Sequence, residues 1–172
     1  MTPAFRVEAL SAEHRRDEFV CGVEPLDRYF HEQVTQDIRR RFANCFVATE
    51  KTTDRIAGYY TLSATSIVLE DLPEATRKKL PRYPTVPAVR IGRLAVARDF
   101  LRIGLGAALL ADAVARSMNS DIAVYALIVD AKDKTAADFY QHHGFKSFGE
   151  SPLMLYLPFS GLGNLLFKPK GK

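Results

Sequence analysis

The chain of 172 residues contains only two cysteines, Cys21 and Cys45, and four histidines. Two cysteines are too few for a disulfide scaffold, and the cysteines and histidines lack the spacing of a metal site. No apolar run approaches the roughly 20 residues of a membrane-spanning helix, and the first residues lack the basic and apolar regions of a signal peptide. We therefore expect free thiols, no metal, no membrane association and a cytoplasmic protein.

The chain also lacks internal repeats and a strong charge imbalance, since its formal net charge is +4. A hydrophobic content of 47% suits one globular domain, which we expect over residues 1–160, followed by a basic tail over 161–172. The cations are unevenly spread, and such clusters suit an anionic partner. They lie at Arg39–Arg41, at Arg77, Lys78 and Lys79 with Arg82, and at Arg90 with Arg93.

Apolar periodicity and turn residues predict strands that alternate with helices. Strands are expected at 5–10, 42–50, 56–67, 88–97, 122–129, 145–148 and 154–157, and the second and third form an antiparallel hairpin. Helices are expected at 12–19 with Ser11 as N-cap, and at 25–41, 72–80, 105–118 and 134–143. This order predicts an α/β or α+β layer fold around a mixed sheet, with ligand bound at the C-terminal ends of its central strands.

A glycine-spaced turn at Gly104 and Gly106 follows the strand that ends near Val96 and opens a helix. Without Cβ atoms the backbone can approach a ligand closely, and the first N–H groups of the helix can point at anionic oxygens. The turn is neither a dinucleotide-binding fingerprint nor a P-loop. It predicts a diphosphate cradle, although small residues also suit an ordinary strand-to-helix connection.

Three motifs resemble the GNAT acetyltransferase superfamily: the strand Arg93–Val96, the turn Gly104–Gly106 and the helix-to-strand segment Ala136–Phe145. Further short pieces, in this order along the chain, resemble the TacT-like toxin branch of type II toxin–antitoxin systems. They are Phe19–Gly22, Leu26 with Asp27, Gly58–Ser63, Pro87, Gly92–Val96 and Leu110–Ala113. The resemblance implies the GNAT fold, a central mixed and mostly antiparallel sheet flanked by helices.

The resemblance implies acetyl-coenzyme A (acetyl-CoA) as the cofactor. It assigns the backbone of Leu94, Ala95 and Val96 to the pantetheine arm. The amides of Ile103, Gly104, Leu105, Gly106 and Ala107 would hold the diphosphate. Leu101 and Arg102 open this turn, and Leu101 stands where the family usually has Gln or Arg. The resemblance further assigns Asp133, Ala136 and Phe139 to the cofactor site.

Members of the branch acetylate the α-amino group of aminoacyl-tRNA, which blocks translation, and are neutralised by a ribbon-helix-helix antitoxin. The resemblance implies the same activity and partner here, and a homodimer is compatible with it. Arg77, Lys78, Lys79, Arg90 and Arg93 are the cations we expect on tRNA, although each cluster could be a solvated helix end and Arg93 a structural ion-pair partner. The tail could dock on the domain, on a second subunit or on the antitoxin.

Tyr140 is the candidate general acid, because a tyrosine is protonated at neutral pH and can donate to a departing thiolate. The alternative is that Tyr140 packs between Phe139 and Phe145 in the core. We assign no general base, since an esterified α-amine is partly neutral near pH 7 and water could accept its proton. A backbone N–H freed by a bulge near Leu94 or Val96 could stabilise the oxyanion.

Tyr59, Tyr60 and Ser63 could line the acceptor pocket, or could alternate between core and solvent as in any strand. Two other functions stay open. One is acetylation of a small amine or a protein N-terminus on the same fold. The other is a catalytically silent protein that binds RNA or an antitoxin.

Overall fold

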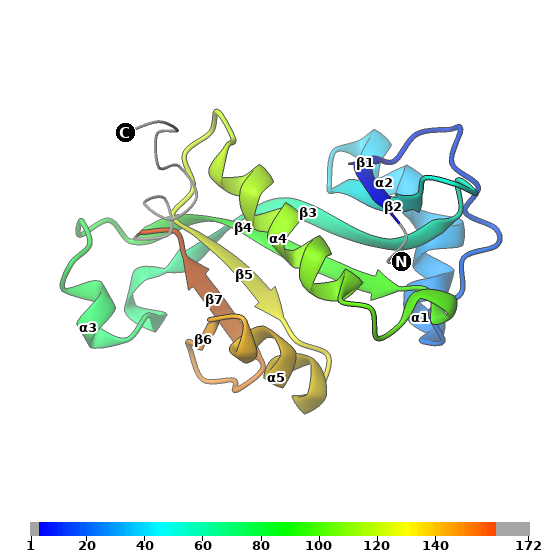
Figure 1. Cartoon of the computed structure of the whole chain (residues 1–172). Helices are drawn as coiled ribbons and strands as arrows, with labels where there is room; N and C mark the ends of the chain where they lie inside the picture. The colour runs from blue at the N-terminus through cyan, green and yellow to red at the C-terminus, as the bar shows by residue number, and fades with distance from the viewer. Residues whose placement is uncertain (1–3, 161–172) are drawn as a thin grey trace, which may run out of the picture. The chain divides into compact units, whose positions relative to one another are not determined.

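Seven strands form one mixed sheet in the computed structural model, which describes residues 4–160 (Figure 1). In spatial order they are β1 (Phe5–Ala9), β2 (Asn44–Glu50), β3 (Ile56–Val68), β4 (Thr85–Val96), β5 (Ala126–Asp130), β7 (Met154–Pro158) and β6 (Lys146–Ser147). The pairs β1–β2, β2–β3, β5–β7 and β6–β7 are antiparallel. The predicted layer fold and the hairpin of the second and third strands are confirmed.

The helical elements are α1 (Glu24–Arg28), the π-helical turn η1 (Tyr29–Gln33), α2 (Val34–Arg40), α3 (Glu74–Arg77), α4 (Leu105–Met118) and α5 (Lys134–His142). Two 3₁₀ turns, η2 (Leu69–Asp71) and η3 (Arg98–Phe100), complete them. The helix expected at 25–41 is therefore present, with a π turn in its middle. The helices expected at 105–118 and 134–143 are confirmed to within one residue, and Gly144 at φ 96° ends α5.

The chain divides into two compact units, Met1–Ser63 with Ile91–Ala113 and Ala64–Arg90 with Val114–Lys172. The divisions fall inside β3, β4 and α4. That residues 1–160 act as one domain stays a prediction. The tail expected at 161–172 lies outside the described residues.

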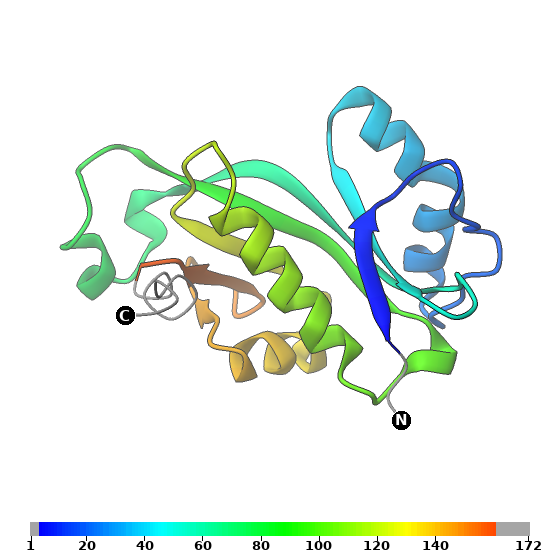
Figure 2. The same ribbon diagram turned by 45° about the horizontal axis from the view of Figure 1, so that its top comes forward.

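An aromatic cluster forms the centre of the first unit. The rings of Phe30 and Tyr59 stack with centroids 4.3 Å apart, and Phe19 meets both edge-on. The Tyr59 hydroxyl donates a hydrogen bond of 2.7 Å to the Leu26 carbonyl. These contacts fix the α1–η1–α2 segment against β3 (Figure 2).

The second unit is built on the antiparallel pair β5–β7, in which Ile128 lies opposite Tyr156. Tyr156 is fully buried and meets Phe148 edge-on, with ring centroids 5.6 Å apart. Its hydroxyl lies 3.1 Å from Thr76 Oγ1, so α3 is tied to this core.

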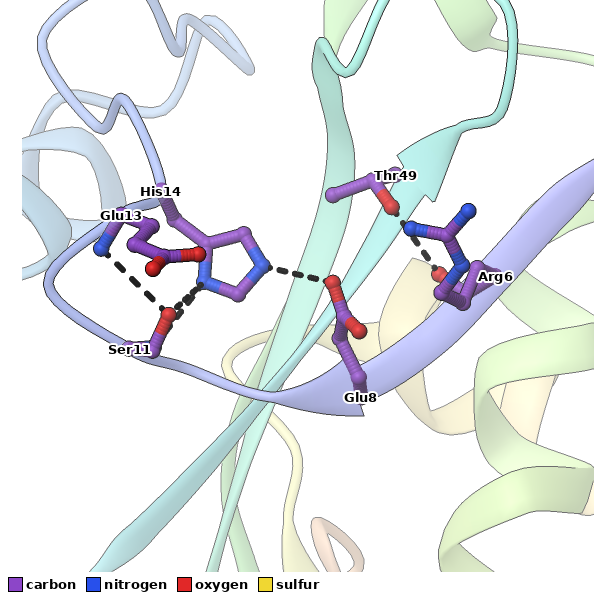
Figure 3. Close-up of polar contacts among 6 residues, drawn as sticks. All are labelled: Arg6, Glu8, Ser11, Glu13, His14 and Thr49. Atoms are coloured by element: carbon purple, nitrogen blue, oxygen red, sulfur yellow. Dashed lines mark hydrogen bonds and ion pairs between the residues drawn. The ribbon is translucent and has the colours of Figure 1, made fainter.

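The helix expected at 12–19 is wrong, because the segment forms two turns. His14 Nδ1 accepts the Ser11 N–H at 2.9 Å, and His14 Nε2 lies 2.9 Å from Glu8 Oε1 (Figure 3). The Arg16 guanidinium donates to the Phe30 carbonyl at 2.7 Å. These side-chain bonds to backbone groups hold the segment in turns instead of a helix, because they compete with the backbone bonds that a helix needs.

Two other expected elements are shorter than predicted. The helix expected at 72–80 is reduced to the four residues of α3, because the N–H groups of Lys79 and Leu80 donate to carbonyls three residues back instead of four. The strand expected at 122–129 begins at Ala126, and Ile122 is 77% exposed. The Ile122 N–H donates to Ser120 Oγ, which makes a turn there.

Candidate active site

The turn after β4 is bent by two residues in the left-handed region, Arg102 at φ 63° and Gly104 at φ 83°. The first backbone bond of α4 runs from the Ala108 N–H to the Gly104 carbonyl. The N–H groups of Leu105, Gly106 and Ala107 therefore have no hydrogen-bond acceptor within the helix. Exposed N–H groups at the positive end of a helix dipole suit a phosphate.

Gly104 is required by its backbone rather than by crowding. A Cβ at this position would meet no heavy atom within 4 Å, so the space in front of the turn is open. Leu101 and Ile103 are 50% and 43% exposed on the same turn. The turn thus fits the diphosphate of acetyl-CoA, with room for a ligand and donors for its oxygens, and the contacts of its individual residues stay predictions.

Gly58 on β3 allows a close approach to both α4 and the end of β4. A Cβ on Gly58 would lie 2.8 Å from Leu109 Cδ1 and 2.9 Å from the Ala95 carbonyl oxygen. Only a glycine lets β3 lie so near both the segment Leu94–Val96 and α4. Sequence reasoning quoted Gly58 as part of a motif and missed this role.

The backbone of Arg93 is held by a side chain of the neighbouring strand. Thr61, which is 1% exposed, accepts the Arg93 N–H on Oγ1 at 3.1 Å. A Cβ on Gly92 would lie 2.9 Å from the same oxygen. A free amide near Leu94 or Val96 for the oxyanion stays a prediction.

The side chain of Arg93 lies over an aromatic ring. Its guanidinium carbon is 3.5 Å from the centroid of Tyr29, and the Tyr29 hydroxyl donates to Asp37 Oδ2 at 2.8 Å. Burial and the bond to Asp37 raise the pKa of Tyr29, against a smaller lowering by Arg93. Within residues 4–160 Arg93 pairs with no carboxylate, so its observed partner is the ring. Tyr29 and Asp37 were missed because only the fold brings them to β4.

Tyr59 and Tyr60 are both fully buried, and their hydroxyls are engaged. Tyr59 donates to Leu26, and Tyr60 donates to Asp112 Oδ2 on α4 at 2.5 Å. Both rings therefore belong to the core of the first unit, and the expected alternation between core and solvent is not seen at these two residues. By sequence, Asp112 is recognised only as part of the motif Leu110–Ala113. Its structural role is to accept the hydrogen bond of the buried Tyr60 hydroxyl.

In the second unit Tyr140 lies on α5 and is 6% exposed. Phe139 and Phe145 meet its ring edge-on, with centroids 5.1 and 5.3 Å away, so the packing alternative describes the ring. Burial raises the pKa of Tyr140 to about 12. The part of the chain that the structure describes offers its hydroxyl no hydrogen-bond partner, and no fully buried side-chain oxygen or nitrogen there lacks one. The hydroxyl therefore keeps some access to solvent.

The other cofactor candidates of this unit start α5. Asp133 is the N-cap, and its Oδ1 accepts the Ala136 N–H at 2.8 Å. The Ala136 N–H is therefore already used, so a cofactor contact by Ala136 would have to involve its other atoms. Phe139 is half-buried beside Tyr140 and His143.

The cations expected on tRNA are accessible. Arg90, Lys78 and Lys79 are exposed, and Arg77 is half-buried at the end of α3. Lys78 Nζ lies 3.5 Å from Glu74 Oε1 in an exposed pair of the kind that contributes little to stability. Their contact with tRNA stays a prediction.

From Ala4 to Ser160 no three histidine, cysteine or carboxylate side chains gather as metal ligands would. Over the same range no helix has the length and apolar content to traverse a bilayer. Cys45 is a free cysteine, and burial raises its pKa to about 12, so it stays a thiol at neutral pH.

Known proteins agree with this fold. The family described as "Acetyltransferase (GNAT) domain" matches residues 10–154. A "tRNA-acetylating toxin" of Mycobacterium tuberculosis (strain ATCC 25618 / H37Rv) is 32% identical over 141 residues, which are 81% of this chain and 82% of that protein.

Two solved structures are also similar. The structure "AtaT complexed with acetyl-methionyl-tRNAfMet" has a TM-score of 0.86 at 28% identity, over 95% of this chain and 100% of that one. A mutant AtaT toxin bound to the C-terminus of the antitoxin AtaR and acetyl-CoA has a TM-score of 0.78 at 25% identity, over 95% and 99%. The chain therefore belongs to the GNAT acetyltransferase family, and within it to the TacT-like toxin branch that its motifs resemble.

Proposed function

We propose that this acetyltransferase transfers the acetyl group of acetyl-CoA to the α-amino group of aminoacyl-tRNA and thereby blocks translation. The observation that carries the proposal is the open turn at Gly104, which presents the first N–H groups of α4 to an anion. The relatives named above, one a tRNA-acetylating toxin and one bound to an acetylated tRNA, support the choice of substrate.

Acetyl-CoA supplies an activated acetyl group as a thioester. Amides from Ile103 to Ala107 would bind its diphosphate, and the backbone of Leu94, Ala95 and Val96 would orient its pantetheine arm. Arg77, Lys78, Lys79, Arg90 and Arg93 would neutralise phosphates of tRNA. Asp133, Ala136 and Phe139 would flank the cofactor from α5.

Tyr140 would move one proton. The amine nitrogen bonds to the acetyl carbon, the carbon–sulfur bond breaks, and the departing sulfur takes the proton of the Tyr140 hydroxyl. Water accepts the proton that the amine loses, and the tyrosinate regains its own from solvent. The solvent access of the Tyr140 hydroxyl supports this role, and burial, which raises its pKa to about 12, keeps the proton in place at every physiological pH.

A ribbon-helix-helix antitoxin would neutralise the enzyme, and the related toxin bound to an antitoxin supports an antitoxin as the partner. A homodimer is the assembly we propose to look for. An enzyme with this substrate would act in the cytoplasm, where charged tRNA is found.

Transfer of labelled acetyl from acetyl-CoA to charged and uncharged tRNA tests the proposal, with wild type beside Tyr140→Phe. Label on charged tRNA alone, lost in the variant, is the expected result. Label on a free amine or peptide instead would keep the acetyltransferase and reject the toxin activity. No transfer to any acceptor would favour a silent binding protein.

A further inference from the structure

A groove of about 650 Å³ lies in the second unit between α3 and the end of the loop that leads to β4. Its floor is apolar, with Val68 51% exposed and Leu69 and Leu80 packed against the buried core. Tyr83 lines it as well and is 70% exposed. Val68 and Tyr83 are thus both exposed to the same hollow of ligand size, as apolar side chains in a binding groove are.

The walls of the groove are held in place by the backbone. The Leu69 N–H donates to the Pro84 carbonyl at 3.0 Å, which joins its two sides next to Tyr83. The Leu80 N–H donates to the Arg77 carbonyl at 3.0 Å. A ligand would therefore meet a preformed surface and would lose little free energy in ordering it.

The charges around Tyr83 suit an anion with a polar edge. Arg77 and Arg82 line the groove, and neither forms an ion pair with any residue from 4 to 160. Glu74 also lines it but pairs with Lys78, which leaves Glu70 as the remaining carboxylate. A carboxylate can accept a hydrogen bond from the exocyclic amine of cytosine or adenine, while guanidinium groups bind phosphates.

An exposed aromatic ring flanked by cations is the surface that binds unpaired nucleic acid, in which a base stacks and the adjoining phosphates are neutralised. We propose that this groove binds unpaired nucleotides of the tRNA, with one base stacked on Tyr83 and phosphates on Arg77 and Arg82. The inference rests on the proposed function, because charged tRNA is the RNA that it would hold. It adds a base contact to what would otherwise be phosphate contacts alone.

The absence of tryptophan from the chain gives a direct test. Tyr83→Trp places a single indole at this exposed position without disturbing the core. A single-stranded RNA of about eight nucleotides that ends in CCA should quench its emission, because a base would stack on it. The same sequence in a duplex should quench far less. Quenching that is equal for both forms would overturn the proposal.

Affinity for the same oligonucleotide, measured by fluorescence anisotropy, gives a second readout. Tyr83→Ala should weaken binding about tenfold, whereas Tyr83→Phe, which keeps the ring, should bind like wild type. Arg82→Gln should lower the slope of log affinity against log salt by about 0.7, the value for one phosphate contact on a single strand. Unchanged affinity in Tyr83→Ala would reject the stacking.

The two proposals fail in different ways. Quenching by RNA, with no acetyl transfer to charged tRNA by wild type, would support the groove as an RNA site and reject the proposed function. Transfer without quenching would support the function and overturn the groove. Quenching by an acidic peptide but not by RNA would make this a protein-docking surface and overturn the proposal as well.

Discussion

The guanidinium of Arg93 lies over the face of the Tyr29 ring, 3.5 Å from its centroid, and Tyr29 is in turn fixed by Asp37. Tyr29 opens the π-helical turn η1, a local widening that often occurs at functional sites. The stack orients a charge on β4 without neutralising it. A carboxylate in the place of the Tyr29 ring would neutralise Arg93, which we propose binds a phosphate of tRNA.

We predict that Tyr29→Leu raises KM for charged tRNA about fivefold, since a cation–π contact contributes about 1 kcal/mol to holding the cation. Tyr29→Phe keeps the ring and should lie near wild type. Phe30→Leu removes a neighbouring buried ring that stacks on Tyr59, and so controls for lost packing. The same KM in Tyr29→Leu and Phe30→Leu would show that the stack has no part in binding.

We predict that Gly104→Ala costs about 1 kcal/mol of stability, because alanine is strained at φ 83°. It should also weaken acetyl-CoA binding, since the strained residue would shift the backbone that carries the first N–H groups of α4. Gly149→Ala is the matched control, with φ 70° and equally open surroundings outside this turn. Calorimetry should show reduced acetyl-CoA affinity in the first variant only, and equal affinity in both would remove the turn from the cofactor site.

We predict that Gly58→Ala destabilises the protein by about 1–3 kcal/mol through overpacking. The added methyl meets Leu109 Cδ1 and the Ala95 carbonyl, and only the side chain can move aside. Shortening it in Gly58→Ala with Leu109→Val should therefore not restore the urea midpoint. Full recovery would mean that the backbone contact is unimportant.

The Asp27 carboxylate accepts the N–H groups of Cys21 and Gly22, at 2.8 and 3.3 Å. Burial alone would raise the pKa of Asp27, but these bonds lower it below its ordinary value. A depressed pKa in the folded state adds stability above the unfolded pKa of about 4, and this stability is lost as pH falls through the folded value. Asp27→Asn should therefore lose less stability than wild type between pH 5 and pH 2, a range that spans the ordinary aspartate pKa of about 4. Urea unfolding at each pH measures the difference.

Burial raises the pKa of Tyr140 to about 12. A raised tyrosine pKa stabilises the folded state fully below the unfolded value of about 10, and the stabilisation fades as pH rises toward the folded value. Wild type and Tyr140→Phe should therefore show the same tyrosinate absorbance up to about pH 11. Loss of one titrating tyrosine near pH 10 in the variant would contradict the burial of the Tyr140 hydroxyl.

Sequence patterns gave good boundaries where apolar residues recur over several turns, as in α4 and α5. They failed at residues 12–19, where hydrogen bonds of Ser11, His14 and Arg16 with the backbone replaced the expected helix. They also failed near Ile122, where a Ser120 side chain makes a turn that no periodicity reveals. Short segments with few apolar residues follow their side-chain hydrogen bonds, most of them here to groups two or three residues away and one, from Arg16, to the distant Phe30 carbonyl.

The sequence by itself determined the alternation of strands and helices, the glycine turn that opens α4 and the family to which the chain belongs, because each depends on residues close together along the chain. Tertiary structure alone decided that Tyr29 lies beneath Arg93, that Gly58 lets Ala95 approach α4, and that Tyr83 stands exposed beside Arg77 and Arg82. These relationships join separate segments, and their geometry is set by how the strands pair and the helices pack rather than by any local pattern.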